Sequence, residues 1–406
     1  MVISRRSTSR SMRPTGSQPL RAARPASARS SCLAASAAVG KARDASVWIC
    51  LLVLLAMPAA ADWPSFRGDP QLTGVAADPL PARLAPLWVF AAEDAVEGTA
   101  AIVGDLVYVG SLDGTLYALD RSRGEPRWRY AAAAEIKSSP TVVDGTVYFG
   151  DESGLFHAVD AATGERRWTY QTEASVVSSA NVWRDLVIFG SYDQLVYALR
   201  ASDGGLAWSL ETESYVHASP AVSGNRAWIT GCDGYLRGVS LADGTETDRL
   251  SLAGYVASSP ALADGHAYVG TFDAQVLAVD LDGPSLTWTY EDPESEFPFY
   301  ASAAVTPELV LAAGRDKTLH AIDRSTGERR WSFEGRARID ASPVVVGDRA
   351  LVASKAGDLY SLALSDGSVL WEYEIGAPVV ASPAVAGGIL VIGTSDGTVY
   401  AFGEAP

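Results

Sequence analysis

The chain is poor in the residues that bind metals or form covalent bridges. Its 406 residues include three cysteines, four histidines and three methionines. Cys32 and Cys50 lie in the first 61 residues, so Cys232 has no disulfide partner in the rest of the chain. The sequence contains no HExxH, CxxC or P-loop motif. We therefore assign no metal site and no catalytic residue from the sequence.

Basic residues are scarce beyond the N-terminal part. The whole chain has a formal net charge of −16 at pH 7. Residues 1–61 carry eight Arg and one Lys against one Asp, which leaves −24 for the remainder. Such a surface repels phosphate backbones, so nucleic acid is not an expected partner. The acidic residues are spread through turn positions, which favours turn chemistry and solubility over cation binding.

A long hydrophobic run is also missing. The longest apolar stretch, Val47–Met57, follows a basic segment and precedes Pro58 and Ala59–Ala61. This pattern is typical of a secretory signal cleaved after Ala61, and the run is too short to span a bilayer comfortably. We therefore expect a periplasmic or secreted protein without a membrane span, with an N-terminal anchor as the alternative. More residues precede the run than a signal needs, which favours a start assigned too far upstream or a transit peptide.

A repeat of forty residues dominates the remainder. In its first copy, two alternating apolar runs, Leu106–Gly110 and Leu116–Leu119, flank the turn dipeptide Asp113-Gly114. This arrangement predicts a β-hairpin, followed by a third strand around Trp128. A period near forty with several strands in each unit indicates a propeller blade or a related array.

A tryptophan that ends each unit gives the number of units. The repeated positions are Trp88, Trp128, Trp168, Trp208, Trp288, Trp331 and Trp371. Asp248 occupies the slot between Trp208 and Trp288, so we expect the fourth blade to be the weakest. At one fixed slot in each blade, these tryptophans are expected to pack between neighbouring sheets rather than to stack on a cofactor.

The two ends of the repeat region complement one another. Leu87–Phe90 is a Trp-bearing strand without a preceding hairpin, whereas Ala381–Phe402 lacks the Trp strand that should follow. Pairing these segments closes a ring and removes exposed sheet edges. We therefore predict an all-β, eight-bladed β-propeller of four-stranded antiparallel blades, with seven blades as the alternative.

The predicted ring divides the chain into three parts: a leader at 1–61, an opening segment and linker at 62–86, and the propeller at 87–403. We expect a monomer. Deletion of residues 62–80 is expected to be mild by comparison with deletion of residues 62–91, because residues 62–80 precede the closing strand.

Each unit begins with a further strand of small residues, such as Ser138-Ser139-Pro140, which suits strands that crowd toward a central axis. The residue two before the inner-strand Ser or its equivalent varies from blade to blade: Glu97, Lys137, Val177, His217, Ala257, Tyr300, Asp340 and Val380. In a ring these positions meet near one mouth of the channel. The polar members, Glu97, Lys137, His217, Tyr300 and Asp340, are the candidate ligand-binding residues. A solvated rim that is free to vary is the alternative.

The units resemble the pyrroloquinoline-quinone (PQQ) repeat of eight-bladed propellers. The resemblance lies in the hairpin, the Tyr117–Asp120 segment, the Thr163-Gly164 turn and the terminal Trp, and it covers residues 62–403. Trp63–Gly74 is similar to the opening motif of bacterial PQQ-binding-like repeat proteins. The family includes quinoprotein alcohol dehydrogenases and non-catalytic periplasmic propellers such as the outer-membrane assembly factor BamB. The resemblance implies the fold more firmly than any activity.

Several departures place the chain closer to the non-catalytic branch. The enzymes have an adjacent cysteine pair over the cofactor, and long insertions that carry calcium and a catalytic Asp. Here Cys232 stands alone, and the only extra length within the repeats is near Glu291–Phe297. No cysteine follows Ala61 directly, so the lipid anchor of BamB is not expected either.

We therefore expect a binding or scaffolding module for a protein, peptide or small ligand, without a cofactor. A PQQ-dependent oxidoreductase, with calcium and a reduced active site, is the alternative.

Overall fold

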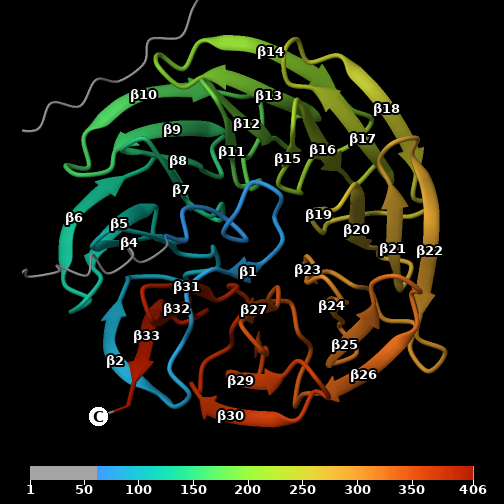
Figure 1. Ribbon diagram of the computed structural model, residues 1–406. Coiled ribbons are helices and arrows are strands. Elements are labelled where there is room, and N and C mark those ends of the chain that lie inside the picture. The colour runs from blue at the N-terminus through green and yellow to red at the C-terminus, as the bar shows by residue number, and fades with distance from the viewer. Residues whose placement is uncertain (1–61, 406) are drawn as a thin grey trace, which may run out of the picture. The chain divides into compact units, whose positions relative to one another are not determined.

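The computed structural model describes residues 62–405, which form a ring of β-sheets around a central axis (Figure 1). Residues 1–61 and 406 lie outside the described part, and so does the expected signal sequence. Within 62–405 there is no α-helix, and hence none that is long and apolar enough to cross a membrane. The eight sheets of the ring confirm the predicted eight-bladed β-propeller.

The two strands nearest the axis are the shortest in each blade. The innermost strands are β3 (Ala101–Val103), β7 (Thr141–Val143), β11 (Asn181–Trp183), β15 (Ala221–Ser223), β19 (Ala261–Ala263), β23 (Ala304–Val305), β27 (Val344–Val346) and β31 (Ala384–Ala386). The second strands are β4 (Leu106–Gly110), β8 (Thr146–Gly150), β12 (Leu186–Gly190), β16 (Arg226–Thr230), β20 (His266–Gly270), β24 (Leu309–Ala313), β28 (Arg349–Ala353) and β32 (Ile389–Gly393).

The two outer strands are longer, because the ring widens with distance from its axis. The third strands are β5 (Thr115–Asp120), β9 (Leu155–Asp160), β13 (Leu195–Arg200), β17 (Tyr235–Ser240), β21 (Gln275–Asp280), β25 (Thr318–Asp323), β29 (Asp358–Ala363) and β33 (Thr398–Glu404). The outermost strands are β6 (Pro126–Ala131), β10 (Arg166–Gln171), β14 (Leu206–Glu211), β18 (Glu246–Ser251), β22 (Ser285–Glu291), β26 (Arg329–Glu334), β30 (Val369–Glu374) and β2 (Leu84–Ala91).

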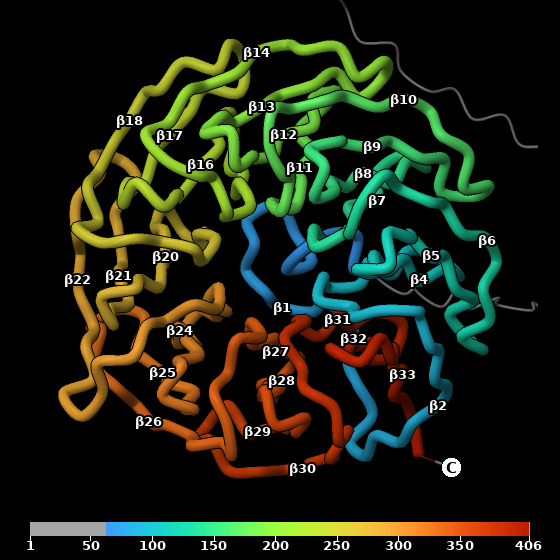
Figure 2. The backbone as a smooth tube through the Cα atoms, turned by 180° about the vertical axis from the view of Figure 1, so that it is seen from behind, coloured from blue at the N-terminus to red at the C-terminus, as the bar shows by residue number. Residues whose placement is uncertain are grey.

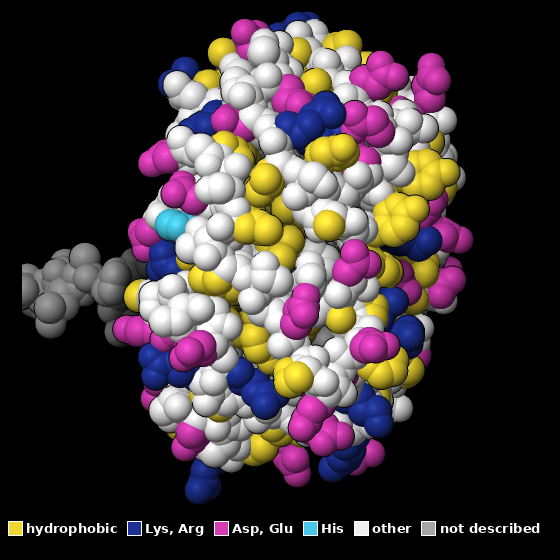
Figure 3. All heavy atoms as spheres, turned by 90° about the vertical axis from the view of Figure 1, so that its right-hand side faces the viewer, with side chains coloured by type: hydrophobic (Ala, Val, Ile, Leu, Met, Phe, Trp, Pro, Cys, Tyr) yellow, Lys and Arg dark blue, Asp and Glu magenta, His cyan; other side chains and the backbone are white. Residues whose placement is uncertain are grey.

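The burial of each strand follows from its place in the blade. In β5 the residues Leu116–Asp120 are all buried, because both faces of the strand pack against neighbouring blades. In β6 exposed and half-buried residues alternate, since one face of this outer strand meets solvent. The side of the ring carries acidic side chains scattered among Lys and Arg (Figure 3), as expected from their spread through the turns.

The last blade is completed by the N-terminal strand, as predicted. Strand β2 pairs antiparallel with β33, and Trp88 lies opposite Ala401. The two strands lie side by side in both views of the backbone (Figures 1 and 2). The strand begins at Leu84, three residues before the predicted Leu87.

The repeat tryptophans join neighbouring blades. The indole N–H of Trp128 donates to the carbonyl of Ala161 in the next blade, at 3.1 Å. Beside it, a Cβ on Gly164 would lie 2.7 Å from the same indole, so only glycine fits there. The same contact between indole and glycine recurs in the pairs Trp88–Gly124, Trp168–Gly204, Trp208–Gly244, Trp288–Gly327 and Trp331–Gly367. These residues therefore stabilise the interfaces between blades, as the sequence indicated.

Asp248, which replaces the tryptophan in the fourth blade, accepts a hydrogen bond from Arg226 at 2.9 Å. On the same sheet face, Trp228 takes a position where other blades have a smaller residue, and its side chain is buried. It leans over Gly238, where a Cβ would lie 3.0 Å from the Trp228 ring. The fourth blade therefore has its tryptophan on β16 instead of β18.

The opening segment crosses one end of the central channel. Its backbone carbonyls accept hydrogen bonds from inner-strand N–H groups, including Pro64 from Val142, Pro70 from Val222 and Gly74 from Val345. Strand β1 (Val75–Ala76) then pairs parallel with β27. The segment lies at the centre of the ring in both backbone views (Figures 1 and 2).

Three residues of this segment are deeply buried, Trp63, Arg67 and Leu72. Burial lowers the pKa of Arg67 to about 9, despite the opposing effect of Asp69. Its guanidinium donates to the carbonyl of Ala303 at 2.9 Å and lies against Gly74, where any Cβ would collide with it. Because this segment is so well packed, deletion of residues 62–80 is expected to lower stability even though the closing strand is retained.

Candidate functional site

All eight of the variable positions line one cavity of about 560 Å³ on the axis of the ring. Glu97, Lys137, His217, Tyr300 and Asp340 are brought together there, with Val177, Ala257 and Val380 between them. Each residue lies in the loop that leads into an innermost strand. The ring thus places in one site residues that the sequence separates by multiples of about forty. Whether they bind a ligand remains a prediction.

A belt of hydroxyl groups surrounds the deeper part of the cavity. Seven serines and Thr99 occupy the position two residues after each variable one, and all are buried. The N–H of Ser139 donates to the Ser179 hydroxyl at 2.9 Å, and the same link joins seven of the eight successive pairs. The belt explains why the sequence keeps small polar residues at this position. It links the inner strands to one another and restricts their movement next to the variable ring.

Phe66, from the opening segment, also lines the cavity. The segment that closes one end of the channel therefore forms part of the cavity floor, and the cavity opens at the other end of the ring. We call that open end the mouth.

The mouth contains a second variable ring that the sequence analysis missed. It lies in the turns, two residues after the end of each second strand, and comprises Leu112, Glu152, Tyr192, Cys232, Phe272, Arg315, Lys355 and Ser395. Each of these N–H groups donates to a carbonyl of the loop that enters an inner strand, such as Lys355 to Arg338 at 3.0 Å. Arg338, in an adjoining loop, lines the cavity, and so do four members of this ring, Glu152, Tyr192, Arg315 and Lys355. Their spacing of about forty residues, with identities that differ between blades, was the available signal.

One part of the cavity lining is a neutral, hydrogen-bonded group formed by Tyr192, His217 and Tyr300. Tyr192 and Tyr300 place their hydroxyls 2.7 and 3.2 Å from the two ring nitrogens of His217. Burial lowers the pKa of His217, so its neutral form is favoured. Burial likewise raises the pKa of Tyr192 to about 12. A neutral imidazole bonded at both nitrogens has no free lone pair for a metal ion.

Other charged residues of the lining form ion pairs. Asp340 lies 2.8 Å from Arg315 and 3.1 Å from Arg338, so one carboxylate faces two guanidinium groups. Arg315 also stacks over the ring of Tyr300, 4.3 Å from its centroid. Lys137 pairs with Glu152 at 2.8 Å, and this bond raises the pKa of Lys137 despite partial burial.

Large aromatic side chains are exposed on loops beside the mouth. Tyr215, Tyr255, Phe272 and Phe297 are 52, 67, 37 and 59% exposed. We call these four residues the aromatic ledge. The ledge is joined to the cavity, because Phe272 meets Tyr300 edge-on at 6.1 Å.

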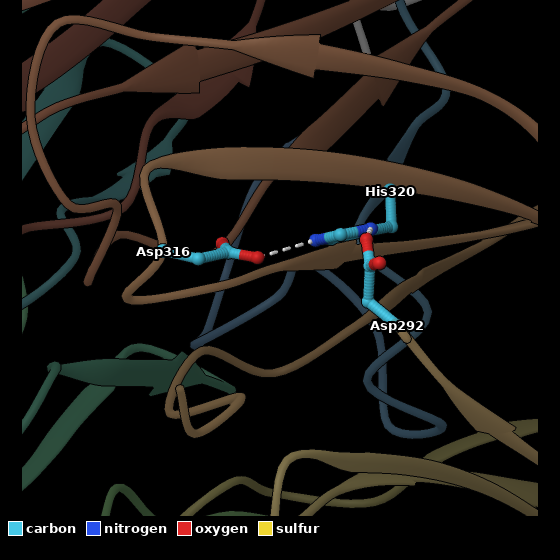
Figure 4. A group of neighbouring side chains, drawn as sticks. All are labelled: Asp292, Asp316 and His320. Carbon is cyan, nitrogen blue, oxygen red and sulfur yellow. Dashed lines mark hydrogen bonds and ion pairs between the residues drawn. The ribbon is translucent and has the colours of Figure 1, made fainter. Parts of the chain in front are cut away.

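Two carboxylates and a histidine that do not line this cavity form a cluster (Figure 4). Asp316 lies 3.0 Å from Nε2 of His320, whereas Asp292 lies 3.5 Å from Nδ1 on the other edge of the ring. The Tyr290 hydroxyl is also 3.0 Å from Nδ1.

His157 has a matching environment in the second blade, between Asp151 and Tyr130. Burial by itself raises the pKa of Asp151. Hydrogen bonds from His157 and Ser153 outweigh this effect, so the pKa lies below its ordinary value. We therefore interpret both histidines as parts of the blade core, with each imidazole held from two sides.

Together these features define an eight-bladed β-propeller with an axial cavity that is closed at one end and lined by variable loop residues. The chain belongs to the PQQ-repeat family. The family model that matches is described as outer membrane protein assembly factor BamB, and it matches residues 82–215, 176–249, 193–334 and 315–405.

Solved structures of low sequence identity share the fold. BamB from Moraxella catarrhalis is 20% identical with a TM-score of 0.70, covering 79% of this chain and 98% of its own. The computationally designed protein Ika8 is 18% identical with a TM-score of 0.71, covering 79% and 99%. Quinohemoprotein alcohol dehydrogenase from Comamonas testosteroni is 15% identical with a TM-score of 0.75, covering 85% and 81%. No curated protein matches the chain in sequence.

Proposed function

We propose that the protein is an exported, soluble propeller that acts as a scaffold and binds a protein or peptide partner at the mouth. The observation that carries this proposal is the aromatic ledge. Among residues 62–405, the exposed large aliphatic side chains lie on outermost strands, such as Leu286 on β22 and Val369 on β30. The exposed large aromatic side chains instead lie on loops of three neighbouring blades beside the mouth. Exposed aromatic groups beside a cavity are typical of interaction surfaces.

The family supports a protein as the partner. Its model is described as an outer membrane protein assembly factor, a role that depends on contacts with other proteins. The rigid blades would present the mouth loops in fixed positions, which reduces the entropy lost on binding. We also propose that the protein acts as a monomer in the periplasm, in accord with the signal-like segment before Asp62.

Site-specific photocrosslinking in cells tests this function. A benzoylphenylalanine at Tyr255 should give a discrete covalent adduct with a partner. The same group at Leu286, which is 50% exposed on the rim of the ring, should not. Equal adduct yields at the two positions, or no adduct at either position, would contradict a binding site at the mouth. Cell fractionation of the same strain tests the location.

The oxidoreductase alternative requires a site for PQQ and calcium. Calcium takes about six to eight oxygen ligands, including carboxylates. The cavity is lined by three carboxylates, of which Asp340 faces two arginines and Glu152 pairs with Lys137. Glu97 alone is left, so this donor set does not fit calcium, and we derive no catalytic step. Titration with PQQ and calcium tests this point, since tight 1:1 binding with dye-linked alcohol oxidation would favour the enzyme.

A further inference from the structure

We infer that the cavity receives the C-terminal end of an extended peptide, with the terminal carboxylate against Arg315, Arg338 and Lys355. We call these three residues the basic corner. The inference rests on the proposed function, because it names the part of the partner that enters the mouth. It draws on the distribution of charge, the closed floor and the link between the basic corner and the aromatic ledge.

Positive charge is concentrated in this cavity. Beyond residue 61 the chain has three lysines, Lys137, Lys317 and Lys355, and two of them line the cavity. With Arg315 and Arg338, four cations face three carboxylates there, whereas residues 62–406 carry a net charge of −24. The cavity is thus a local exception on an acidic molecule. A concave site of this kind draws in anionic groups.

The basic corner has unmatched charge. Asp340 is shared between Arg315 and Arg338, so two cations face one carboxylate. Lys355 adds a third, and among residues 62–405 no carboxylate lies within ion-pair distance of it. A bound carboxylate would accept charge-assisted hydrogen bonds from this group.

The closed floor restricts what can enter. Residues 62–76 cross the far end of the channel, and Phe66 lines the cavity from below. A polypeptide therefore cannot pass through the ring and has to enter by one end. The volume of about 560 Å³ is typical of small-ligand sites, so only a short end fits. A positively charged N-terminus would be repelled by the basic corner, whereas a C-terminal carboxylate would be attracted.

The basic corner continues into the aromatic ledge. The guanidinium of Arg315 stacks on Tyr300, Tyr300 contacts Phe272, and the N–H of Phe272 donates to the carbonyl of Tyr255. A chain whose last residue lies in the corner can therefore place the apolar side chains that precede it on Phe272 and Tyr255. A small anion would contact the corner alone, so the ledge favours a peptide.

A pool of hexapeptides tests the inference. The peptides carry an N-terminal fluorescein and random residues elsewhere, and each is made as a free acid and as a C-terminal amide. At pH 7 and low salt, the purified full-length protein should retain the free acids about tenfold better, since a charge-assisted contact is lost in the amides. Equal retention of acids and amides would overturn the inference. So would amides with internal Asp or Glu that bind as well as the free acids.

Matched variants locate the effect. Lys355→Met should remove most of the preference for free acids, whereas Lys317→Met should leave it unchanged, because Lys317 does not line the cavity. Glu97→Gln should increase retention of the free acids, since it removes a repelling carboxylate from the lining. Equal effects of the two lysine substitutions would overturn the inference. If all peptides bind alike at the ledge, or none bind, the inference fails while the crosslinking at Tyr255 still decides the proposed function.

Discussion

At the residue scale, Trp128 of one blade can pack closely on Gly164 of the next because this glycine has no side chain. Gly164 has a φ of +76° and leaves no space for a Cβ against the indole. Gly145, in the same blade, has a similar φ of +70°, but a Cβ there would meet only the end of Arg167, at 3.8 Å. The two glycines therefore share the backbone conformation and differ in the packing.

Alanine substitutions separate these two effects. Gly145→Ala should lower the free energy of unfolding by about 1–2 kcal/mol, the cost of the left-handed conformation. Gly164→Ala should cost a further 1–3 kcal/mol or so, because the methyl group overpacks the interface with Trp128. Urea denaturation followed by tryptophan fluorescence measures both. Equal losses would show that the indole does not depend on this glycine.

At the scale of the element, the fourth blade has its tryptophan on β16, and β18 has Asp248 at the position of the repeat tryptophan. Trp228 lies opposite Gly238, and Gly238 lies opposite Asp248 across the sheet. The first blade has the order Tyr108, Ala118 and Trp128 at the same three positions. The first blade therefore has two aromatic rings on this face and the fourth blade has one, and the larger ring of Trp228 extends over Gly238 toward Asp248.

A double-mutant cycle tests whether Trp228 compensates for the missing ring at Asp248. Trp228→Tyr alone should cost about 1–2 kcal/mol through lost packing. Asp248→Trp alone should also destabilise, because the new ring meets Trp228 and the pair with Arg226 is lost. Together the two changes restore the order of the first blade, so the double variant should be more stable than the sum by about 1 kcal/mol or more. Additive losses in thermal unfolding would contradict the compensation.

At the scale of the whole molecule, the first thirty described residues have two roles. Strand β2 closes the ring against β33, and residues 62–76 cross the end of the channel. The two roles fall on adjacent segments, so truncation can separate them.

Deletion of residues 62–80 should lower the free energy of unfolding by about 3 kcal/mol or more, since the buried side chains of Trp63 and Leu72 are removed. The truncated protein should remain monomeric, because β2 is retained. Deletion of residues 62–91 should also cause aggregation, because it exposes the edge of β33. Melting temperatures and light scattering distinguish the two. If both variants stay monomeric, the ring is not closed by β2.

The sequence by itself determined the blade count, the closure and the variable ring at Glu97, Lys137, His217, Tyr300 and Asp340. Each of these follows from the fixed period of the repeat, because every blade has the same backbone path. Positions whose side chains are not needed for packing within the blade can differ from one blade to the next.

Tertiary structure alone decided the rest. The opening segment contains no repeat, so only the folded ring shows that it crosses the channel and closes one end. The basic corner combines Arg315 and Lys355 of one variable ring with Arg338 of an adjoining loop. Which cations are paired and which are left over depends on distances across the axis, and these are set by the closure of eight sheets into a ring rather than by spacing along the chain.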